Sequence, residues 1–250
     1  MTAPSLSGQR ATVLTYGDSL TWGVNPGARC RHLACDRWPV VLGCGLGDQV
    51  EIIAEGLPGR TTAYDDPGAV VDRNGARVLP PILASHVPLD VVIFMLGTND
   101  LKPQICGTAS GATQGMRQLL RIVLRQRNIY DMPAPKILVV SPPVARITDA
   151  TGANPFWLER CRQAQELAPL FRAVADAEGA AFFDAACVAR TSDVDGVHLD
   201  ADASRAIGAA LVPVVARLLQ QDPATGSSAF GTDPCRSQIS PCHPDAEGNK

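Results

Sequence analysis

The sequence predicts a doubly wound α/β domain, with a mainly parallel five-stranded sheet and helices on both of its faces. Two observations predict this class. Short, nearly continuous runs of apolar and β-branched residues recur along the chain, as expected for strands that are buried on both faces. Longer stretches with helical spacing of apolar residues lie between these runs. Because strand–helix–strand connections are right-handed, this alternation favours helices on both faces of one sheet.

Five apolar runs are predicted as strands. They cover residues 11–16, 50–55, 90–96, 136–141 and 180–185. Ligands of doubly wound domains bind beyond the carboxyl ends of the strands, so the residues that follow each run are the candidates for function.

Three segments are predicted as helices from the spacing of their apolar residues. They cover residues 111–129, 156–178 and about 202–220. Pro169 and Pro213 interrupt the second and third patterns. We expect a kink or a break at each proline, because proline removes a helical hydrogen bond and clashes with the preceding turn.

The composition of the chain changes near residue 221. The first 220 residues are long enough for one domain with a sizeable core, and 46% of the whole 250-residue chain is hydrophobic. Residues 221–250 are rich in Pro, Gly, Ser and Asp and poor in large apolar side chains. Such a segment cannot bury enough apolar surface to offset its ordering entropy, so we expect an extended or disordered tail.

Charge and hydropathy exclude several classes of partner. The formal net charge is −3, without the basic surplus of a nucleic-acid-binding protein. No apolar run approaches the 18 or more residues that predict a membrane span. The N-terminal segment has no cationic start followed by an apolar block, so it does not resemble a signal peptide. We therefore expect a cytoplasmic protein that binds neither nucleic acid nor membrane.

The chain has eight cysteines, more than a cytosolic protein needs. Cys44, Cys161 and Cys187 lie in apolar or helical patterns, which predicts small core residues. Two further pairs lie in loop-like sequence beside a histidine, where a disulfide or a zinc site is the alternative to free thiols. Neither pair has the spacing of a zinc knuckle, and we expect no metal. The pairs are Cys30 and Cys35 beside His32, and Cys235 and Cys242 beside His243.

Polar residues and a glycine turn follow four of the five predicted strands. Ser19 follows the first strand in "GDS", Gly59 the second in "EGLPGRTT", and Asn99 the third in "GTND". Asp195 and His198 follow the fifth strand in "DGVHLD". The fold brings these segments to one edge of the sheet, where they supply the groups that acyl transfer requires.

Each of these groups has a chemical role. A serine hydroxyl attacks an ester only when a base takes its proton, and His198 is the candidate base for Ser19. Asp195 is placed to orient the imidazole and to stabilise the imidazolium. The backbone N–H groups of Ser19 and Gly59 and the side-chain amide of Asn99 are the candidate donors to the oxyanion.

Each signal alone also has a purely structural explanation. Gly-Asp-Ser is typical of a helix N-cap, and Asn99 could cap the next helix. Gly59 could supply only a positive φ, and Asp-x-x-His could arise by chance in this composition. The joint placement after four strands favours the catalytic interpretation.

These segments resemble the SGNH (GDSL-type) hydrolase family, whose four named residues are Ser, Gly, Asn and His. Ser19, Gly59 and Asn99 match the first three blocks of the family, and Asp195 and His198 match the last block. "GDSLTWG" and "EGLPGRTTAYDDP" resemble in particular its arylesterase/acyltransferase branch. The resemblance implies a flavodoxin-like SGNH hydrolase fold for the domain at 1–220.

The resemblance also implies an activity. Members of that branch are cofactor-independent serine esterases that hydrolyse short-chain acyl esters of small molecules. Some of them transfer the acyl group to alcohols or peroxide, and many form homo-oligomers that narrow the entrance to the site. The insert "NPGARCRHLACDRW" and the long tail depart from this branch.

Three aromatic residues are candidates for the substrate pocket. Trp22, three residues after Ser19, is either an acyl-pocket wall or a core tryptophan of the first helix. Phe156 and Trp157 either line the entrance or serve packing. Asp18 and Asp100 flank the site residues, and the resemblance implies a structural role for both.

Other functions remain open at this point. The same mechanism would serve a carbohydrate O-acetyl esterase, a thioesterase or a lysophospholipase. A remote alternative is a non-catalytic flavodoxin-like domain that binds flavin or a nucleotide.

Overall fold

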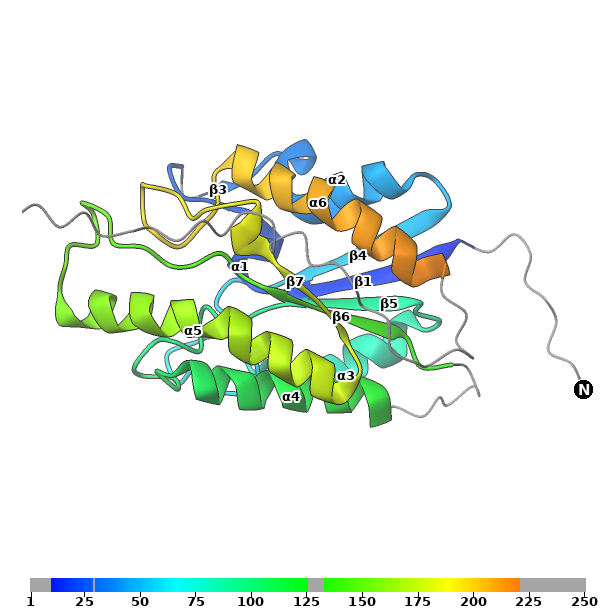
Figure 1. Cartoon of the computed structure of the whole chain (residues 1–250), viewed down its shortest axis with the longest axis horizontal. Helices are drawn as coiled ribbons and strands as arrows, with labels where there is room; N and C mark the ends of the chain where they lie inside the picture. Colours follow the sequence, from blue (N-terminus) through cyan, green and yellow to red (C-terminus); the bar gives the residue numbers. More distant parts are fainter. Residues whose placement is uncertain (1–9, 29, 126–132, 221–250) are drawn as a thin grey trace, which may run out of the picture.

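The sheet of this protein is parallel and five-stranded, with the strand order β4-β1-β5-β6-β7 (Figure 1). A computed structural model describes residues 10–28, 30–125 and 133–220. The strands are β1 Ala11–Gly17, β4 Val50–Gly56, β5 Val91–Met95, β6 Lys136–Ser141 and β7 Ala181–Asp184. All five predicted strands are therefore present, and the doubly wound α/β class is confirmed.

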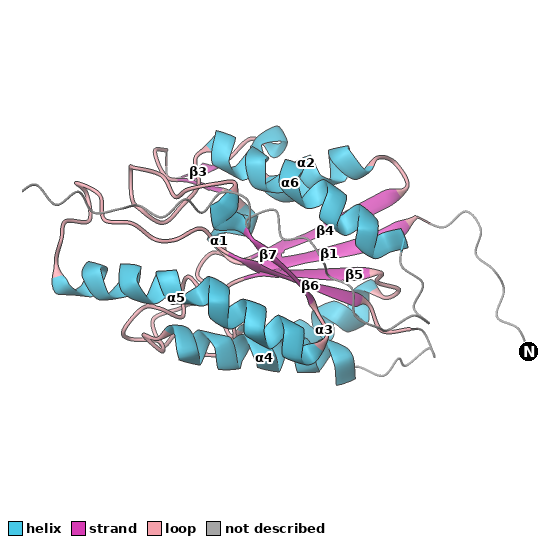
Figure 2. Ribbon diagram, in the orientation of Figure 1, coloured by secondary structure: helices cyan, strands magenta, loops and turns pink. Residues whose placement is uncertain are grey.

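Helices cover both faces of the sheet (Figure 2). One face carries α2 Trp38–Leu46 and α6 Ala201–Gln220, and the other carries α3 Gly75–His86, α4 Ala109–Arg125 and α5 Pro155–Glu178. The short elements are α1 Ser19–Trp22, β2 Val24–Asn25, β3 Cys30–Arg31 and the 3-10 helices Ala34–Asp36 and Ala185–Cys187.

Alternating side chains of the strands fill two hydrophobic cores. Val13 and Ile93 pack on the side of α2 and α6, whereas Leu14 and Phe94 pack on the side of α3, α4 and α5. All four side chains are fully buried. Burial on both faces explains why these strands have continuous apolar runs instead of an alternating pattern.

The helices contain the main differences from the sequence-based prediction. Pro169 and Pro213 lie inside α5 and α6, which continue through them, so of the predicted kink or break the break is wrong at both positions. In α5 the flanking Leu167 and Phe171 are buried, and this tertiary packing offsets the lost hydrogen bond. Neither α2 nor α3 was predicted, because α2 contains glycines and α3 contains two consecutive prolines.

The cysteines also differ from the prediction. Cys44 is exposed on α2 and Cys187 is exposed and disulfide-bonded, so the predicted core role is wrong for both. Cys161 is half-buried. Cys30 and Cys35 are exposed free thiols, so the alternative of a disulfide between them is wrong.

Several predictions fall outside the described part of the chain. The tail at 221–250, with Cys235 and Cys242, lies there. Within the described ranges, no group of three or more His, Cys, Asp or Glu side chains could hold a metal ion. None of the helices that the structure describes is long and apolar enough to cross a membrane.

The strand order places three of the candidate segments next to one another. β1 lies between β4 and β5, and its last residue, Gly17, pairs with Gly56 on one side and Met95 on the other. The segments that carry Ser19, Gly59 and Asn99 therefore leave the same edge of the sheet side by side. The segment after β7 has to cross back along this edge to reach Ser19.

Candidate active site

Ser19 lies at the tight turn from β1 into the short helix α1. Asp18 caps this helix, because its Oδ1 accepts a hydrogen bond of 2.9 Å from the backbone N–H of Leu20. A side chain at Gly17 would overlap Thr21, so this turn requires a glycine. The turn presents Ser19, which is only 7% exposed, at the carboxyl edge of the sheet.

A chain of hydrogen bonds joins Ser19 to the segment after β7. The Oγ of Ser19 lies 3.0 Å from Nε2 of His198. Nδ1 of the same ring lies 2.7 Å from Oδ2 of Asp195. This is the arrangement in which an imidazole can take the proton of a serine hydroxyl while a carboxylate holds its other nitrogen.

Asp195 is held by the turn that it begins. Its Oδ1 accepts hydrogen bonds of 2.9 Å from the backbone N–H groups of both Val197 and His198. Burial alone would raise the pKa of this carboxyl. The hydrogen bonds from the His198 ring and from the two amides outweigh burial, and the pKa of Asp195 is lowered. The carboxylate is therefore ionised at neutral pH and can stabilise an imidazolium.

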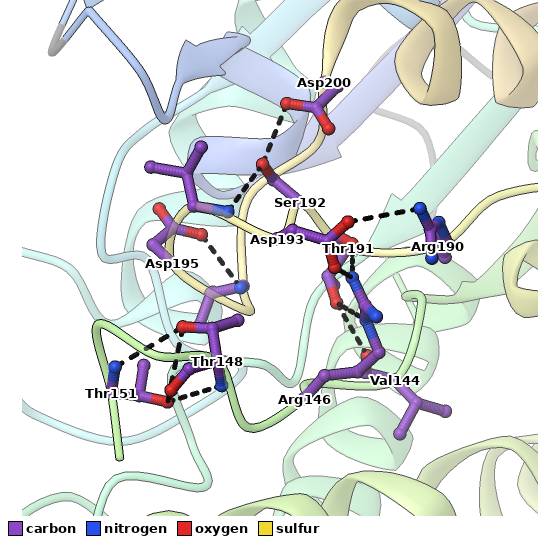
Figure 3. Close-up of polar contacts among 12 residues, drawn as sticks. Val144, Arg146, Thr148, Thr151, Arg190, Thr191, Ser192, Asp193, Asp195 and Asp200 are labelled. Carbon is purple, nitrogen blue, oxygen red and sulfur yellow. Dashed lines mark hydrogen bonds and ion pairs between the residues drawn. The ribbon is translucent and has the colours of Figure 1, made fainter.

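Residues that were not predicted from the sequence hold the turn with Asp195 and His198 in place (Figure 3). The guanidinium of Arg146 donates to Asp193 Oδ1 at 2.7 Å and to the Thr191 carbonyl. The backbone N–H of Arg146 donates to the Gly196 carbonyl at 2.8 Å. Thr191 in turn donates to the Val144 carbonyl at 3.1 Å. The loop after β6 therefore supports the loop that carries Asp195.

His32, in the cysteine-bearing insert that follows β1 in the sequence, also supports the loop that carries Asp195 and His198. Its Nε2 lies 2.9 Å from the carbonyl oxygen of Leu199, and the ring is buried. Because a carbonyl oxygen can only accept, this nitrogen carries the hydrogen. Ser192 closes the loop by donating to Asp200 at 2.8 Å and to the His198 carbonyl through its backbone at 2.7 Å.

Two backbone N–H groups are available beside the serine. Gly59 has φ +87°, and a Cβ at this position would lie 2.6 Å from Nε of Arg73, so only glycine fits without strain. Within the described ranges, neither the N–H of Ser19 nor that of Gly59 has a protein acceptor. Both can therefore donate to a ligand.

The amide of Asn99 connects the segments that follow the three neighbouring strands. Its Nδ2 donates to Oδ2 of Asp18 at 3.2 Å and to the carbonyl of Arg60 at 3.1 Å. Both of its hydrogens therefore have acceptors in the free protein. An oxyanion would have to share or displace one of these acceptors.

The model of the GDSL-like lipase/acylhydrolase family matches residues 15–250. The chain belongs to this family. Its members are carboxylic ester hydrolases, and the geometry at Ser19 suits that chemistry. Comparison with curated proteins finds no match to the chain.

Solved structures of the same fold are similar to this GDSL-like hydrolase along almost their whole length. A carbohydrate acetylesterase family member from Sinorhizobium meliloti is 50% identical with a TM-score of 0.81, over 84% of this chain and 99% of that one. The native M. smegmatis aryl esterase is 39% identical with a TM-score of 0.77, over 83% and 99% of the two chains. Est24, a carbohydrate acetylesterase from Sinorhizobium meliloti, is 38% identical with a TM-score of 0.76, over 84% and 100%.

Two buried carboxyl groups lie behind the site of this hydrolase. Burial raises the pKa of Asp18 to about 6 and that of Asp100 to about 7. Asp100 accepts hydrogen bonds from the backbone N–H of Thr62 at 3.0 Å and from the Thr62 hydroxyl. Asp18 and Asp100 therefore bind turn amides of the segments that follow β1 and β4.

The three aromatic candidates lie near the surface. Trp22 is half-buried outside both cores, with the Arg31 guanidinium 5.0 Å from the centre of its ring, so the core alternative is wrong. Phe156 is 70% exposed in the first turn of α5, so it does not serve packing among the residues that the structure describes. Trp157 is half-buried under the guanidinium of Arg160, at 4.8 Å.

Proposed function

We propose that this protein is a serine esterase that hydrolyses short-chain acyl esters of aryl or alkyl alcohols through an acyl-enzyme. The observation that carries this proposal is the hydrogen-bonded chain from Ser19 Oγ to His198 Nε2 at 3.0 Å and from His198 Nδ1 to Asp195 at 2.7 Å. The free N–H groups of Ser19 and Gly59 beside it support an oxyanion site.

In the proposed mechanism, Ser19 Oγ attacks the ester carbonyl while His198 Nε2 takes the serine proton. Asp195 stabilises the imidazolium that forms. The tetrahedral intermediate then expels the alcohol, which leaves with the proton from His198. A water molecule attacks the acyl-enzyme with His198 again acting as the base, and the acid is released. No step requires a cofactor.

The negative oxygen of the intermediate is stabilised by the N–H groups of Ser19 and Gly59 and by the amide of Asn99. Such a donor is typically worth about 3–4 kcal/mol in the transition state. The contact of Asn99 with Asp18 is the longer of its two hydrogen bonds, at 3.2 Å, and we propose that the oxyanion competes with this one. The carbonyl of Arg60 then keeps the amide in place.

We extend the proposal to acyl transfer, in which an alcohol or peroxide replaces water. The small exposed fraction of Ser19, 7%, supports limited access of water to an acyl-enzyme. Trp22, Phe156 and Trp157 are the proposed pocket residues. We also propose that the protein is a homo-oligomer, because Phe156 is 70% exposed and a second copy of the chain would cover it. Its proposed location is the cytoplasm.

A second candidate function is the removal of O-acetyl groups from a carbohydrate. The 50% identity to a carbohydrate acetylesterase family member favours it. The mechanism would be the same, so only the substrate distinguishes the two candidates. Comparison of kcat/KM among acetylated sugars, aryl acetates and an acyl thioester ranks them, with the highest value identifying the substrate class.

The test of the mechanism is Ser19→Ala with 4-nitrophenyl acetate as the substrate. We expect kcat to fall at least about 10⁴-fold, as it does when a triad nucleophile is removed. Ser85→Ala is the matched control, because Ser85 is an exposed serine of α3 whose hydroxyl donates to the Ile82 carbonyl. Mass spectrometry after fluorophosphonate treatment is expected to show the adduct on Ser19. Turnover of Ser19→Ala at the rate of Ser85→Ala would sink the proposal.

A further inference from the structure

Three basic residues lie on segments beside the proposed oxyanion donors, and Lys102 interacts electrostatically with the other two. Arg73 comes from the loop before α3, Lys102 from the turn that begins at Asn99, and Arg160 from the second turn of α5. Figure 1 shows that α5 begins beyond the carboxyl edge of the sheet, which lets its first turns approach the site. We call Arg73, Lys102 and Arg160 the cationic rim.

Each member of the cationic rim contacts a segment that carries an oxyanion donor. The guanidinium of Arg73 lies over Gly59, where it occupies the space of a side chain. The backbone N–H of Lys102 donates to the carbonyl of Asn99 at 3.2 Å. Nη2 of Arg160 donates to the carbonyl of Thr98, the residue before Asn99, at 3.4 Å. Each rim residue is therefore anchored to a segment that carries an oxyanion donor.

Two of the three cations of the rim have no ion-pair partner within the described parts of the chain. Arg73 pairs with Asp66 at 2.8 Å. Within the described parts of the chain, neither Lys102 nor Arg160 forms an ion pair. Both side chains are half-buried, and burial lowers the pKa of each; the nearby charge of Arg160 lowers that of Lys102 further.

Buried polar atoms without partners mark the same place. Nε of Arg73, Nε of Arg160 and Oγ1 of Thr98 are buried and have no hydrogen-bond partner in the described structure. Thr98 is only 7% exposed. Buried donors are nearly always satisfied, so unpaired donors beside cations without an ion-pair partner indicate a missing acceptor. An anion that brings several oxygens would supply both the acceptors and the opposite charge.

We propose that the site selects esters that carry a carboxylate, bound by Lys102 and Arg160 with Arg73 beside them. This inference rests on the proposed esterase function and names its substrate class. Trp157 holds the Arg160 guanidinium in place through the contact of 4.8 Å. The carboxylate belongs either to the acyl group or to the alcohol, and the experiment below separates these two sources.

Two pairs of substrates test this proposal, each with one anionic and one neutral member. Mono-4-nitrophenyl adipate against 4-nitrophenyl hexanoate places the carboxylate in the acyl group. 4-Acetoxybenzoate against its methyl ester places the carboxylate in the alcohol. The measured quantity is the ratio of kcat/KM for the anionic ester to kcat/KM for the neutral ester, at about pH 7.5, where carboxylates are ionised.

We expect this ratio to fall about tenfold in Lys102→Gln and in Arg160→Gln for one of the two pairs, mainly through KM for the anionic ester. The matched control is Arg162→Gln, because Arg162 lies on the exposed side of α5 and pairs with Glu159 at 2.6 Å. Its ratio is expected to equal that of the wild type. In the wild type, the ratio is also expected to fall as the NaCl concentration is raised from about 0.02 M to about 0.5 M, because salt screens the attraction between the rim and the carboxylate. This measurement does not depend on the folding of a variant.

Ratios within about twofold of the wild type in both variants and for both pairs would overturn the inference. An equal fall of the ratio in Arg162→Gln would also overturn it. An equal loss of kcat/KM for the anionic and the neutral esters would overturn it as well, because such a loss would assign the rim to oxyanion stabilisation or to folding. A wild-type enzyme that hydrolyses neither neutral ester in a Ser19-dependent manner would instead contradict the proposed function.

Discussion

Gly196 is the position where one methyl group is expected to separate the groups of the triad. It lies between Asp195 and His198 and has φ +70°. A Cβ at this position would overlap the carbonyl oxygen of Arg146 and lie 3.0 Å from its carbonyl carbon and 3.2 Å from Cγ2 of Thr148. These neighbours form the loop that supports the triad turn (Figure 3).

The cost of Gly196→Ala follows from this geometry. The left-handed φ costs an alanine about 1–2 kcal/mol. The overlap is with backbone, and the hydrogen bond from Arg146 N–H to the Gly196 carbonyl couples the two segments. Relief therefore moves the turn that carries Asp195 and His198 by roughly 1 Å, and a misplacement of about 1 Å costs about 10²-fold in rate. We expect kcat/KM to fall about 10²-fold and the free energy of unfolding to fall by about 2–3 kcal/mol.

The assay is kcat/KM for 4-nitrophenyl acetate together with urea unfolding. Gly152→Ala is the matched control, because Gly152 has φ +63° but nothing within 4 Å of an added Cβ. It is expected to lose about 1 kcal/mol of stability and to keep kcat/KM within about twofold. If Gly196→Ala is as active as Gly152→Ala, the reasoning that this backbone contact positions the triad is refuted.

Two further predictions concern carboxyl groups. Asp195→Asn presents an NH₂ group to Nδ1 of His198, which favours the tautomer with its hydrogen on Nε2 facing Ser19. We expect kcat to fall about 10⁴-fold, and a fall below about tenfold in kcat measured across pH contradicts the role of the carboxylate. The pKa of Asp100 is raised from 3.8 to about 7 by burial, so the folded chain binds more protons than the unfolded chain between these values. The contribution of Asp100 to the free energy of unfolding therefore falls as the pH rises through this window, by about 4 kcal/mol. Urea unfolding from about pH 4 to about pH 8 is expected to give a flatter dependence for Asp100→Asn, and equal slopes contradict it.

The sequence predicted the sheet and the proposed triad because both depend on local patterns. A strand that is buried on both faces has a continuous apolar run, and its carboxyl end is the place where a doubly wound domain binds ligands. Asp195 and His198 are three residues apart, so one turn brings them together. Ser19 joins them because β1 lies between β4 and β5 and ends at the same edge of the sheet, and no local pattern encodes this strand order.

The support of the site could not be predicted in the same way. Arg146 meets Thr191 across 45 positions, and His32 meets Leu199 across 167 positions. No periodicity encodes such contacts, because they arise from how two loops pack at one sheet edge. A role of Arg160 at the site could not be predicted either, since an arginine on a charged helix is usually solvated. The partial burial of such a guanidinium becomes evident only once its neighbours are known.

The buried carboxyl groups show why costly residues are kept beside the serine. Asp18 and Asp100 both have pKa values raised by burial, so their ionised forms lower the stability of the fold at neutral pH. Yet each carboxyl offers two acceptor oxygens, and the structure uses both oxygens of Asp18: one caps α1 at Leu20, and the other binds the Asn99 amide. A neutral asparagine at position 18 would offer one acceptor and turn an N–H group toward Asn99. The carboxyl at position 18 therefore positions both the serine turn and the Asn99 amide with one side chain. Its burial lowers the stability of the domain at neutral pH, and the placement of these two groups is what the buried carboxyl provides.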